Sequence, residues 1–243
     1  LDYFARHGFA AHAVNLRGHG ASQGREKLRW TRIADYVDDV ANAARQLPGP
    51  PVVIGHSMGG FVIQKYLEEC DAPGAVLLSS PPPAGLWGSA LRIARRRPFT
   101  FAKINLTLSL LPVVATPELA PEAFFSTDLP DEELRRYWKL MQDGSYLAFL
   151  DMVALDLPKP ANVKTPLLIL GAARDTMLRP GEIEATARAY HTRFEIIPDV
   201  AHNSMLERRW QSVAERIVAW LKHEVHAPKN SAVDAALPTQ AAL

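Results

Sequence analysis

The chain lacks the features that mark several broad classes of protein. Cys70 is the single cysteine among 243 residues, which excludes an internal disulfide framework and a cysteine-rich zinc site. The 27 lysines and arginines nearly balance the 26 aspartates and glutamates, so no overall field draws the chain to nucleic acid or to an anionic membrane. No run of about 20 uncharged apolar residues is present, so no transmembrane helix is predicted. With 48% apolar and 22% charged residues, the composition is that of a globular domain with a sizeable core.

Short apolar runs alternate with helical patterns along much of the chain. Runs rich in leucine and β-branched residues predict strands at 10–16, 51–55, 75–79, 166–171 and 194–197. Amphipathic patterns predict helices at 33–47, 58–70, 180–190 and 207–225. This alternation predicts an α/β fold, with a mainly parallel sheet that is covered by helices on both faces.

Residues 81–163 interrupt the alternation. They contain no clear strand, begin with three prolines and are rich in leucine and aromatic residues. A helical cap or lid inserted between two strands is the natural interpretation. We therefore expect a core formed by 1–80 and 164–226, a cap formed by 81–163, and a disordered tail at 227–243.

The insertion carries a local basic cluster, formed by Arg92, Arg95, Arg96 and Arg97. A solvated helix face is the simpler interpretation of this cluster. Because apolar residues flank the arginines, the alternative is a peripheral contact with a lipid interface or a phosphate head group. The leucine and aromatic residues between 99 and 111 likewise indicate packing within the cap or, alternatively, an apolar pocket for an acyl chain.

The strongest motif is Gly55-His56-Ser57-Met58-Gly59-Gly60, a G-x-S-x-G pattern between a predicted strand and a predicted helix. A serine on such a sharp turn is forced out of the sheet, and small residues two positions to either side let neighbouring backbone approach closely. Ser57 is therefore the candidate nucleophile. The backbone N–H of Met58, at the helix N-terminus, is the candidate oxyanion donor. The alternative is a tight turn with an incidental serine.

Four stretches of the sequence resemble the α/β-hydrolase family, and within it the lysophospholipase and monoacylglycerol-lipase-like branch. They are LRGHGAS at 16–22, GHSMGG at 55–60, GAARD at 171–175 and AHNSML at 201–206. The resemblance spans residues 1–225 and is weakest across the insertion. It implies an α/β-hydrolase fold with a helical cap, a lipid-like ester substrate, and neither a metal nor an organic cofactor.

A serine nucleophile needs a neighbouring base, and histidine has a pKa suited to that role near neutral pH. In the resembled fold the acid and the histidine follow the serine in chain order. His202 lies just after the predicted strand 194–197 and before the last helix, as the base should. His191 precedes that strand, and His223 and His226 lie near the end of the chain.

The acid that orients the histidine should follow the preceding strand. Asp175 lies four residues beyond Gly171, which closes that predicted strand, so it is the candidate acid. Asp199 is only three residues before the candidate base. Asp151 and Asp156 belong to the insertion.

The resembled family takes a second oxyanion donor from a loop, usually marked by a histidine-glycine pair, that follows the strand before 10–16. That strand and loop are absent from this sequence, so we expect an N-terminally truncated core with impaired catalysis. His19 and Gly20 form such a pair but follow the wrong strand. We interpret 17–20 as a structural turn.

Together these inferences predict a serine hydrolase that cleaves carboxylic esters through an acyl-enzyme, with monoacylglycerols or lysophospholipids as the implied substrates. Peptidase, thioesterase and carbon–carbon bond hydrolase chemistries stay open, as does a non-catalytic ligand-binding homologue. The expected partners are a small-molecule or lipid ester and no nucleic acid. A cytoplasmic location is favoured, although an upstream segment could carry a targeting signal, and the sequence does not indicate an oligomeric state.

Overall fold

Four of the five predicted strands form, and they lie in one parallel sheet. The computed structural model describes residues 1–116 and 123–225, so the predicted tail at 227–243 and His226 lie outside the described residues. The strands are β1 (Val53–His56), β2 (Ala75–Leu78), β3 (Leu167–Ala172) and β4 (Phe194–Ile197), in the spatial order β1-β2-β3-β4. Every pairing is parallel, so the carboxyl ends of all four strands lie at the same edge of the sheet.

The prediction of a fifth strand at 10–16 is wrong. These residues have no regular secondary structure, and residues 12–15 are exposed to solvent. A strand is stabilised by hydrogen bonds to a neighbour, and within the described residues β1 pairs with β2 alone. The apolar run at 10–16 therefore has no partner, and the outer edge of β1 is open.

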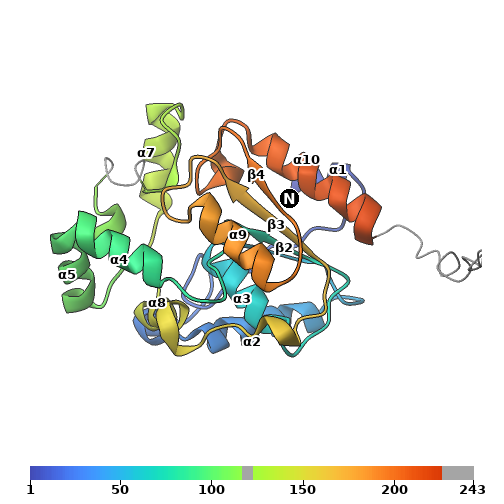
Figure 1. Ribbon diagram of the computed structural model, residues 1–243, viewed down its shortest axis with the longest axis horizontal. Helices are drawn as coiled ribbons and strands as arrows, with labels where there is room; N and C mark the ends of the chain where they lie inside the picture. The colour runs from blue at the N-terminus through green and yellow to red at the C-terminus, as the bar shows by residue number, and fades with distance from the viewer. Residues whose placement is uncertain (117–122, 226–243) are drawn as a thin grey trace, which may run out of the picture.

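One face of the sheet packs against the C-terminal helix. α10 (Trp210–Trp220) leads into a short π-helix, η6 (Leu221–Val225), so the predicted helix at 207–225 begins three residues late. The short N-terminal helix α1 (Asp2–Arg6) contacts α10 (Figure 1). The core on this face contains Val76, Leu78, Leu168, Leu170, Val213, Ile217 and Trp220.

The opposite face of the sheet is covered by α3 (Met58–Tyr66) and α9 (Pro180–Ala189), and α2 (Ile33–Arg45) packs against α3. Its core contains Val53, Ala75, Leu77, Ile169, Ile63, Tyr66, Leu67 and Ile183. Successive residues of β2 thus point to opposite faces, and both sets are buried. This confirms a sheet with helices on both faces and explains why the sequence of β2 is a continuous apolar run.

The insertion at 81–163 is helical, and its described part contains no strand. α4 (Trp87–Arg96) and α5 (Pro98–Thr107) pack together at one end of the molecule, with the sheet between them and α10 (Figure 1). α7 (Asp131–Leu140) and α8 (Tyr146–Leu150) follow. The remaining short helices are η1 (Arg25–Trp30), η2 (Leu111–Val114), η3 (Asp151–Leu155), η4 (Pro160–Asn162) and η5 (Ser204–Leu206). None of the helices in the described ranges is long and apolar enough to cross a bilayer.

The last part of the insertion packs into the core. Ala148 and Met152 are buried against α2 and α3. The fully buried carboxylate of Asp151 accepts hydrogen bonds from Arg32 Nε at 2.8 Å and from the backbone N–H of Ile33 at 3.0 Å. Asp151 therefore joins the insertion to the start of α2.

We predict that Asp151→Asn lowers the free energy of unfolding by about 2 kcal/mol, because it weakens charge-assisted hydrogen bonds made by a buried group. Asp128→Asn is the matched control, since its exposed carboxylate pairs with Arg174 at the surface and its loss should leave the free energy of unfolding nearly unchanged. Urea denaturation followed by circular dichroism measures both. Equal losses in the two variants would contradict the structural role of Asp151.

Candidate active site

Ser57 is the single residue between β1 and α3. Its backbone adopts φ 52° and ψ −124°, a conformation with positive φ that L-residues rarely take. Its N–H donates to the carbonyl of Leu78 on β2 at 3.0 Å, and its carbonyl accepts from the N–H of Gly60 at 2.9 Å. These bonds hold the turn at the carboxyl end of the sheet, so strand pairing and helix initiation together fix the serine.

The glycines of the G-x-S-x-G motif have different steric roles. A Cβ atom on Gly55 would lie 2.4 Å from the carbonyl oxygen of Gly59, and one on Gly60 would lie 2.6 Å from the side chain of Ser80. A Cβ atom on Gly59 would meet nothing within 4 Å. Close approach therefore requires glycine at 55 and 60, whereas the sequence argument assigned this need to 55 and 59.

The structure brings together the three side chains that the sequence singled out. His202 Nε2 lies 2.9 Å from Ser57 Oγ, and His202 Nδ1 lies 2.8 Å from Asp175 Oδ2. The side chains of His202 and Asp175 are buried. The contacts thus link a serine to a base that can take its proton, and link that base to a carboxylate that can orient it.

The second oxygen of Asp175 fixes its carboxylate in place. Asp175 Oδ1 accepts hydrogen bonds from the backbone N–H groups of Met177 at 2.9 Å and Leu178 at 2.8 Å. Both carboxylate oxygens therefore have partners, and Oδ2 is aimed at His202. A buried carboxylate is stable only with such partners.

The backbone N–H of Met58 has no hydrogen-bond acceptor among the described residues. As the first residue of α3 it has no acceptor within its own helix, and it makes no hydrogen bond to another described residue. It lies directly after Ser57 at the positive end of the helix dipole. It is available to a developing oxyanion beside the serine.

The other acids and histidines considered from the sequence do not contact Ser57, His202 or Asp175 through a described hydrogen bond. Asp156 pairs with Lys65 at 2.9 Å, and Asp199 pairs with Arg174 and Arg209 at the surface. His191 and His223 are exposed, and neither is hydrogen-bonded to Ser57 or Asp175. The 17–20 segment forms a turn that Arg17 ties to Asp39 of α2 through Nε at 3.0 Å.

His56 is a site residue that the sequence argument missed. Its Nε2–H donates to the backbone carbonyl of His202 at 2.8 Å, and the two ring centroids lie 4.8 Å apart. Burial, together with the smaller effect of the neighbouring His202, lowers the pKa of His56 to about 3. His56 is therefore a neutral donor at physiological pH that holds the backbone of His202. Its position beside Ser57 in the motif was the available signal.

The insertion also reaches the loop of His202. The ring of Phe124 lies 5.5 Å from the His202 ring, and the N–H of Asn203 donates to the carbonyl of Phe124 at 2.9 Å. Two residues later, Ser126 donates from its backbone N–H to buried Glu207 at 2.8 Å and also from its hydroxyl. Residues 124–126 thus hydrogen-bond to two residues that follow His202 in the chain, Asn203 and Glu207. No sequence signal marks these contacts, which join residues about 80 positions apart.

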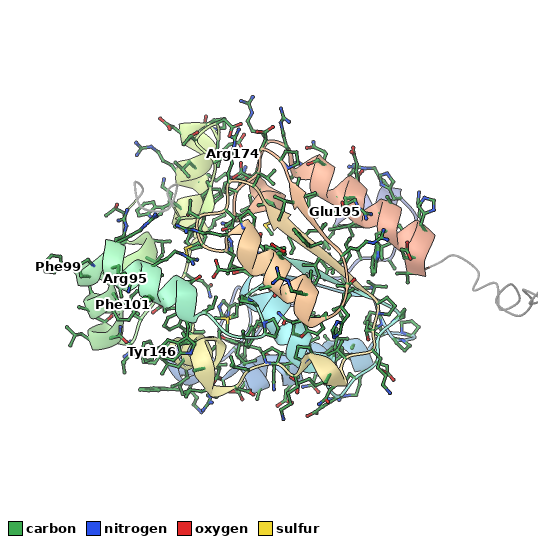
Figure 2. The ribbon with its side chains drawn as sticks, viewed as in Figure 1. Arg95, Phe99, Phe101, Tyr146, Arg174 and Glu195 are labelled. Atoms are coloured by element: carbon green, nitrogen blue, oxygen red, sulfur yellow. The ribbon has the colours of Figure 1, made fainter. Side chains whose placement is uncertain are left out.

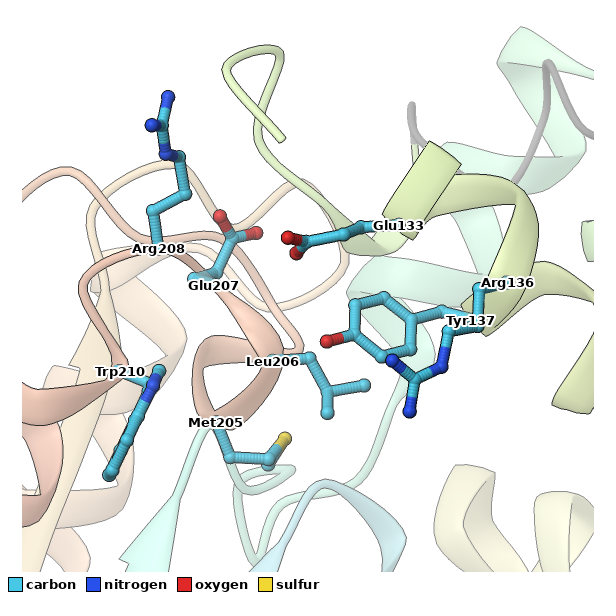
Figure 3. Close-up of a pocket in the computed structure, with 8 residues that line it drawn as sticks. All are labelled: Glu133, Arg136, Tyr137, Met205, Leu206, Glu207, Arg208 and Trp210. Atoms are coloured by element: carbon cyan, nitrogen blue, oxygen red, sulfur yellow. The ribbon is translucent and has the colours of Figure 1, made fainter. Parts of the chain in front are cut away.

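Two cavities flank the site. The larger, of about 440 Å³, is polar and lies between α7 and the segment after His202. In Figure 3, Glu133 and Tyr137 of α7 face Glu207 and Leu206 across it. It is completed by Arg136, Met205, Arg208 and Trp210. None of the three side chains in the Ser57–His202–Asp175 chain lines this cavity.

The smaller cavity, of about 140 Å³, lies between α4 and the loop that follows Asp175. Its apolar lining includes Ile93, Pro112, Val113 and Met177, and its lining also includes Arg92, Arg96, Arg97, Thr100, Ser89, Thr176 and Ala123. Ser57, His202 and Asp175 do not line this cavity either, but two of its lining residues, Thr176 and Met177, directly follow Asp175 in the chain. No group of three or more histidine, cysteine or acidic side chains in residues 1–116 and 123–225 is placed to hold a metal ion.

Comparison with known proteins gives both a family and structural relatives. The family model described as "Alpha/beta hydrolase family" matches residues 1–216. An extracellular alpha/beta-hydrolase from a Paenibacillus species is 17% identical, with a TM-score of 0.70 and coverage of 90% of each chain. A monoacylglycerol lipase from Paleococcus ferrophilus is 20% identical, with a TM-score of 0.64, over 90% of this chain and 86% of that one. A thermophilic esterase from Thermogutta terrifontis is 23% identical, with a TM-score of 0.60, over 85% and 77%. At these identities the structural likeness shows a shared fold.

We predict opposite effects for alanine at two glycines of the motif. Gly55→Ala should lower the free energy of unfolding by at least about 2 kcal/mol, because its Cβ atom would overlap the backbone of Gly59. Gly59→Ala should raise it by about 0.5–1 kcal/mol, because alanine favours the helix and its Cβ atom meets no neighbour. Thermal unfolding compares the two, and a larger loss for Gly59→Ala would contradict the steric assignment.

We also predict a pH dependence of stability that comes from His56. Its pKa is about 3 in the folded protein against an ordinary value of 6.5, so between these values the unfolded chain binds one proton more. The free energy of unfolding should therefore fall as pH drops below 6.5, by up to about 1.4 kcal/mol per pH unit from this group. His56→Gln retains an N–H donor and removes the titration. Urea denaturation from about pH 7 to 4 should show a shallower decline for the variant, and parallel declines would disprove the assignment.

Proposed function

The chain belongs to the alpha/beta hydrolase family, and on this basis we propose that it is a serine hydrolase that cleaves carboxylic esters through an acyl-enzyme on Ser57. The observation that carries the proposal is the continuous chain of hydrogen bonds from Ser57 Oγ through His202 to Asp175, at 2.9 and 2.8 Å. A serine hydroxyl becomes a useful nucleophile when a base within hydrogen-bond reach takes its proton. His202 Nε2 is at that distance.

In the proposed reaction, Ser57 Oγ attacks the ester carbonyl carbon while its proton moves to His202 Nε2. The carbonyl oxygen takes up negative charge, and the N–H of Met58 donates to it. Collapse of the tetrahedral intermediate breaks the bond to the alcohol, which leaves with the proton from His202. The acyl group is then bound to Ser57.

Hydrolysis of the acyl-enzyme repeats these steps with water. His202 takes a proton from a water molecule while the water oxygen attacks the acyl carbon. It then gives that proton to Ser57 Oγ as the carboxylic acid product leaves. Asp175 stabilises the charged imidazole throughout and keeps its proton-bearing Nδ1 pointing away from the serine. His56 supports the same geometry through the backbone of His202.

The proposed substrates are esters with apolar acyl chains, such as monoacylglycerols or lysophospholipids. The apolar cavity beside the Asp175 loop supports this substrate class, because side chains such as Ile93, Val113 and Met177 favour a hydrocarbon chain over water. The GHSMGG and AHNSML motifs, which resemble the lysophospholipase and monoacylglycerol-lipase-like branch, support it as well. The Paleococcus ferrophilus relative is a monoacylglycerol lipase by description.

Labelling with a fluorophosphonate tests the proposed nucleophile. We expect covalent modification of the purified chain at Ser57, located by mass spectrometry, and loss of that modification in Ser57→Ala. Ser212→Ala removes an exposed hydroxyl from α10 and should label like the unaltered chain. His202→Ala should slow labelling by about a hundredfold or more, because the serine loses its base.

A series of 4-nitrophenyl esters of increasing acyl length tests the proposed substrate class. Turnover that rises from acetate to medium-length chains supports an apolar acyl site, and turnover restricted to acetate contradicts it. Folded protein that neither labels nor hydrolyses any ester would overturn the proposed activity.

A further inference from the structure

The two helices at the outer end of the insertion expose large apolar side chains. On α5, Phe99 is 90% exposed and Leu106 is 84% exposed, the two highest values among the large apolar side chains that the structure describes. On α4, Trp87 and Leu91 are also exposed. Figure 2 shows Phe99 pointing outward, away from the sheet. α4 and α5 follow each other in the chain and pack together, and we term these four exposed side chains the hairpin surface.

Helical spacing places each apolar pair of the hairpin surface beside a cation. Phe99, Lys103 and Leu106 are spaced by four and three residues, so they share one face of α5. The other face of α5 packs inward through buried Ile104. On α4, spacings of four bring Trp87, Leu91 and Arg95 onto one face in the same way. α5 thus carries large apolar side chains on its outer side as well as its inner side, whereas a helix covering a core needs only one apolar face.

All the charged residues of α4, α5 and the residue between them, together called the hairpin, are basic. Residues 87–107 contain Arg92, Arg95, Arg96, Arg97 and Lys103, and no aspartate or glutamate, although the whole chain has a formal net charge of only +1. Arg92 forms an ion pair with Glu182 at 2.7 Å. Within the ranges that the structure describes, Arg95, Arg96 and Lys103 have no acidic partner. Three cations without an acidic partner in the described ranges therefore lie on the two helices that expose the apolar side chains.

We propose that the hairpin surface docks on an anionic lipid membrane. Large apolar side chains beside cations match the interface of such a membrane, where rings and methyl groups enter the acyl boundary and guanidinium and ammonium groups contact phosphate. Symmetric pairing of two hairpin surfaces is disfavoured, because their like charges repel each other. A membrane of zwitterionic lipid has no net negative charge, so it would attract these cations less strongly.

Docking through this surface would bring lipid to the candidate active site. α4 also lines the small cavity, through Ile93 and Arg92, where that cavity meets Met177 in the loop after Asp175. The same helix thus has one side on the hairpin surface and another beside the site. The inference goes beyond ester hydrolysis, and its test requires no turnover.

Vesicle co-sedimentation of the full chain carrying Ser57→Ala tests docking in the absence of hydrolysis. We expect binding to phosphatidylcholine vesicles with about one third phosphatidylserine to exceed binding to pure phosphatidylcholine by at least tenfold, and to weaken as salt is added. Phe99→Ser with Leu106→Ser should reduce the partition coefficient by about tenfold or more. Arg95→Gln with Arg96→Gln should reduce it by about 30-fold.

Leu140→Ser is the matched control, since Leu140 on α7 is 73% exposed and lies outside the hairpin surface. It should bind vesicles like the Ser57→Ala chain. Because all the substituted hairpin side chains are exposed, circular dichroism and thermal unfolding should be unchanged in every variant.

Three results would overturn the inference. Folded protein could fail to bind anionic vesicles, the hairpin variants could bind as well as the Leu140→Ser control, or sedimentation could reveal a dimer that Phe99→Ser dissociates. If the chain binds vesicles but is not labelled by the fluorophosphonate when Ser57 is intact, the docking proposal stands and only the proposed hydrolase activity is rejected.

Discussion

Parallel pairing of four short strands is the constraint on which the candidate site depends. Because β1 to β4 run in one direction, the loops after β1, β3 and β4 all leave the same edge of the sheet. Ser57, Asp175 and His202 each lie on one of these loops, so residues separated by up to 145 positions come within hydrogen-bond distance. The buried apolar side chains of the strands fix the position of this edge. The polar residues that follow the strands are therefore fixed as well.

Ser57 is held in its unusual backbone conformation by its neighbours. Gly55 and Gly60 allow α3 to lie against β1 and against Ser80, closer than any side chain at those positions would permit. The bond from the Ser57 N–H to Leu78 fixes the other side of the turn. The positive φ of the serine is therefore maintained by packing on two sides, as expected where local strain positions a reactive group.

Much of the fold could be predicted because buried parallel strands have a strong signature. β1 to β4 lie in nearly continuous apolar runs, interrupted by His56 at the end of β1 and by Glu195 in β4, and each candidate site residue lies a few residues beyond such a run. The run at 10–16 has the same signature without forming a strand, because pairing depends on a neighbour that local sequence does not specify. Contacts such as Phe124 with His202, or Ser126 with Glu207, could not be predicted either. They depend on how the insertion packs against the core, which the local sequence does not specify. Likewise the sequence showed the arginines of α4, and only the structure showed that Phe99 and Leu106 point away from the core.

The contacts of residues 124–126 with the His202 loop bear on how this protein could be redesigned. Insertions of this kind are attractive modules to exchange between relatives when a new specificity is sought. Here one stretch of the insertion is also a support for the histidine, through Asn203 and Glu207. A graft that replaced the whole of 81–163 would remove that support along with the old pocket. The part better suited to exchange is the stretch from α4 to η2, whose residues line the smaller cavity and form its outer surface, and which makes no described contact with His202.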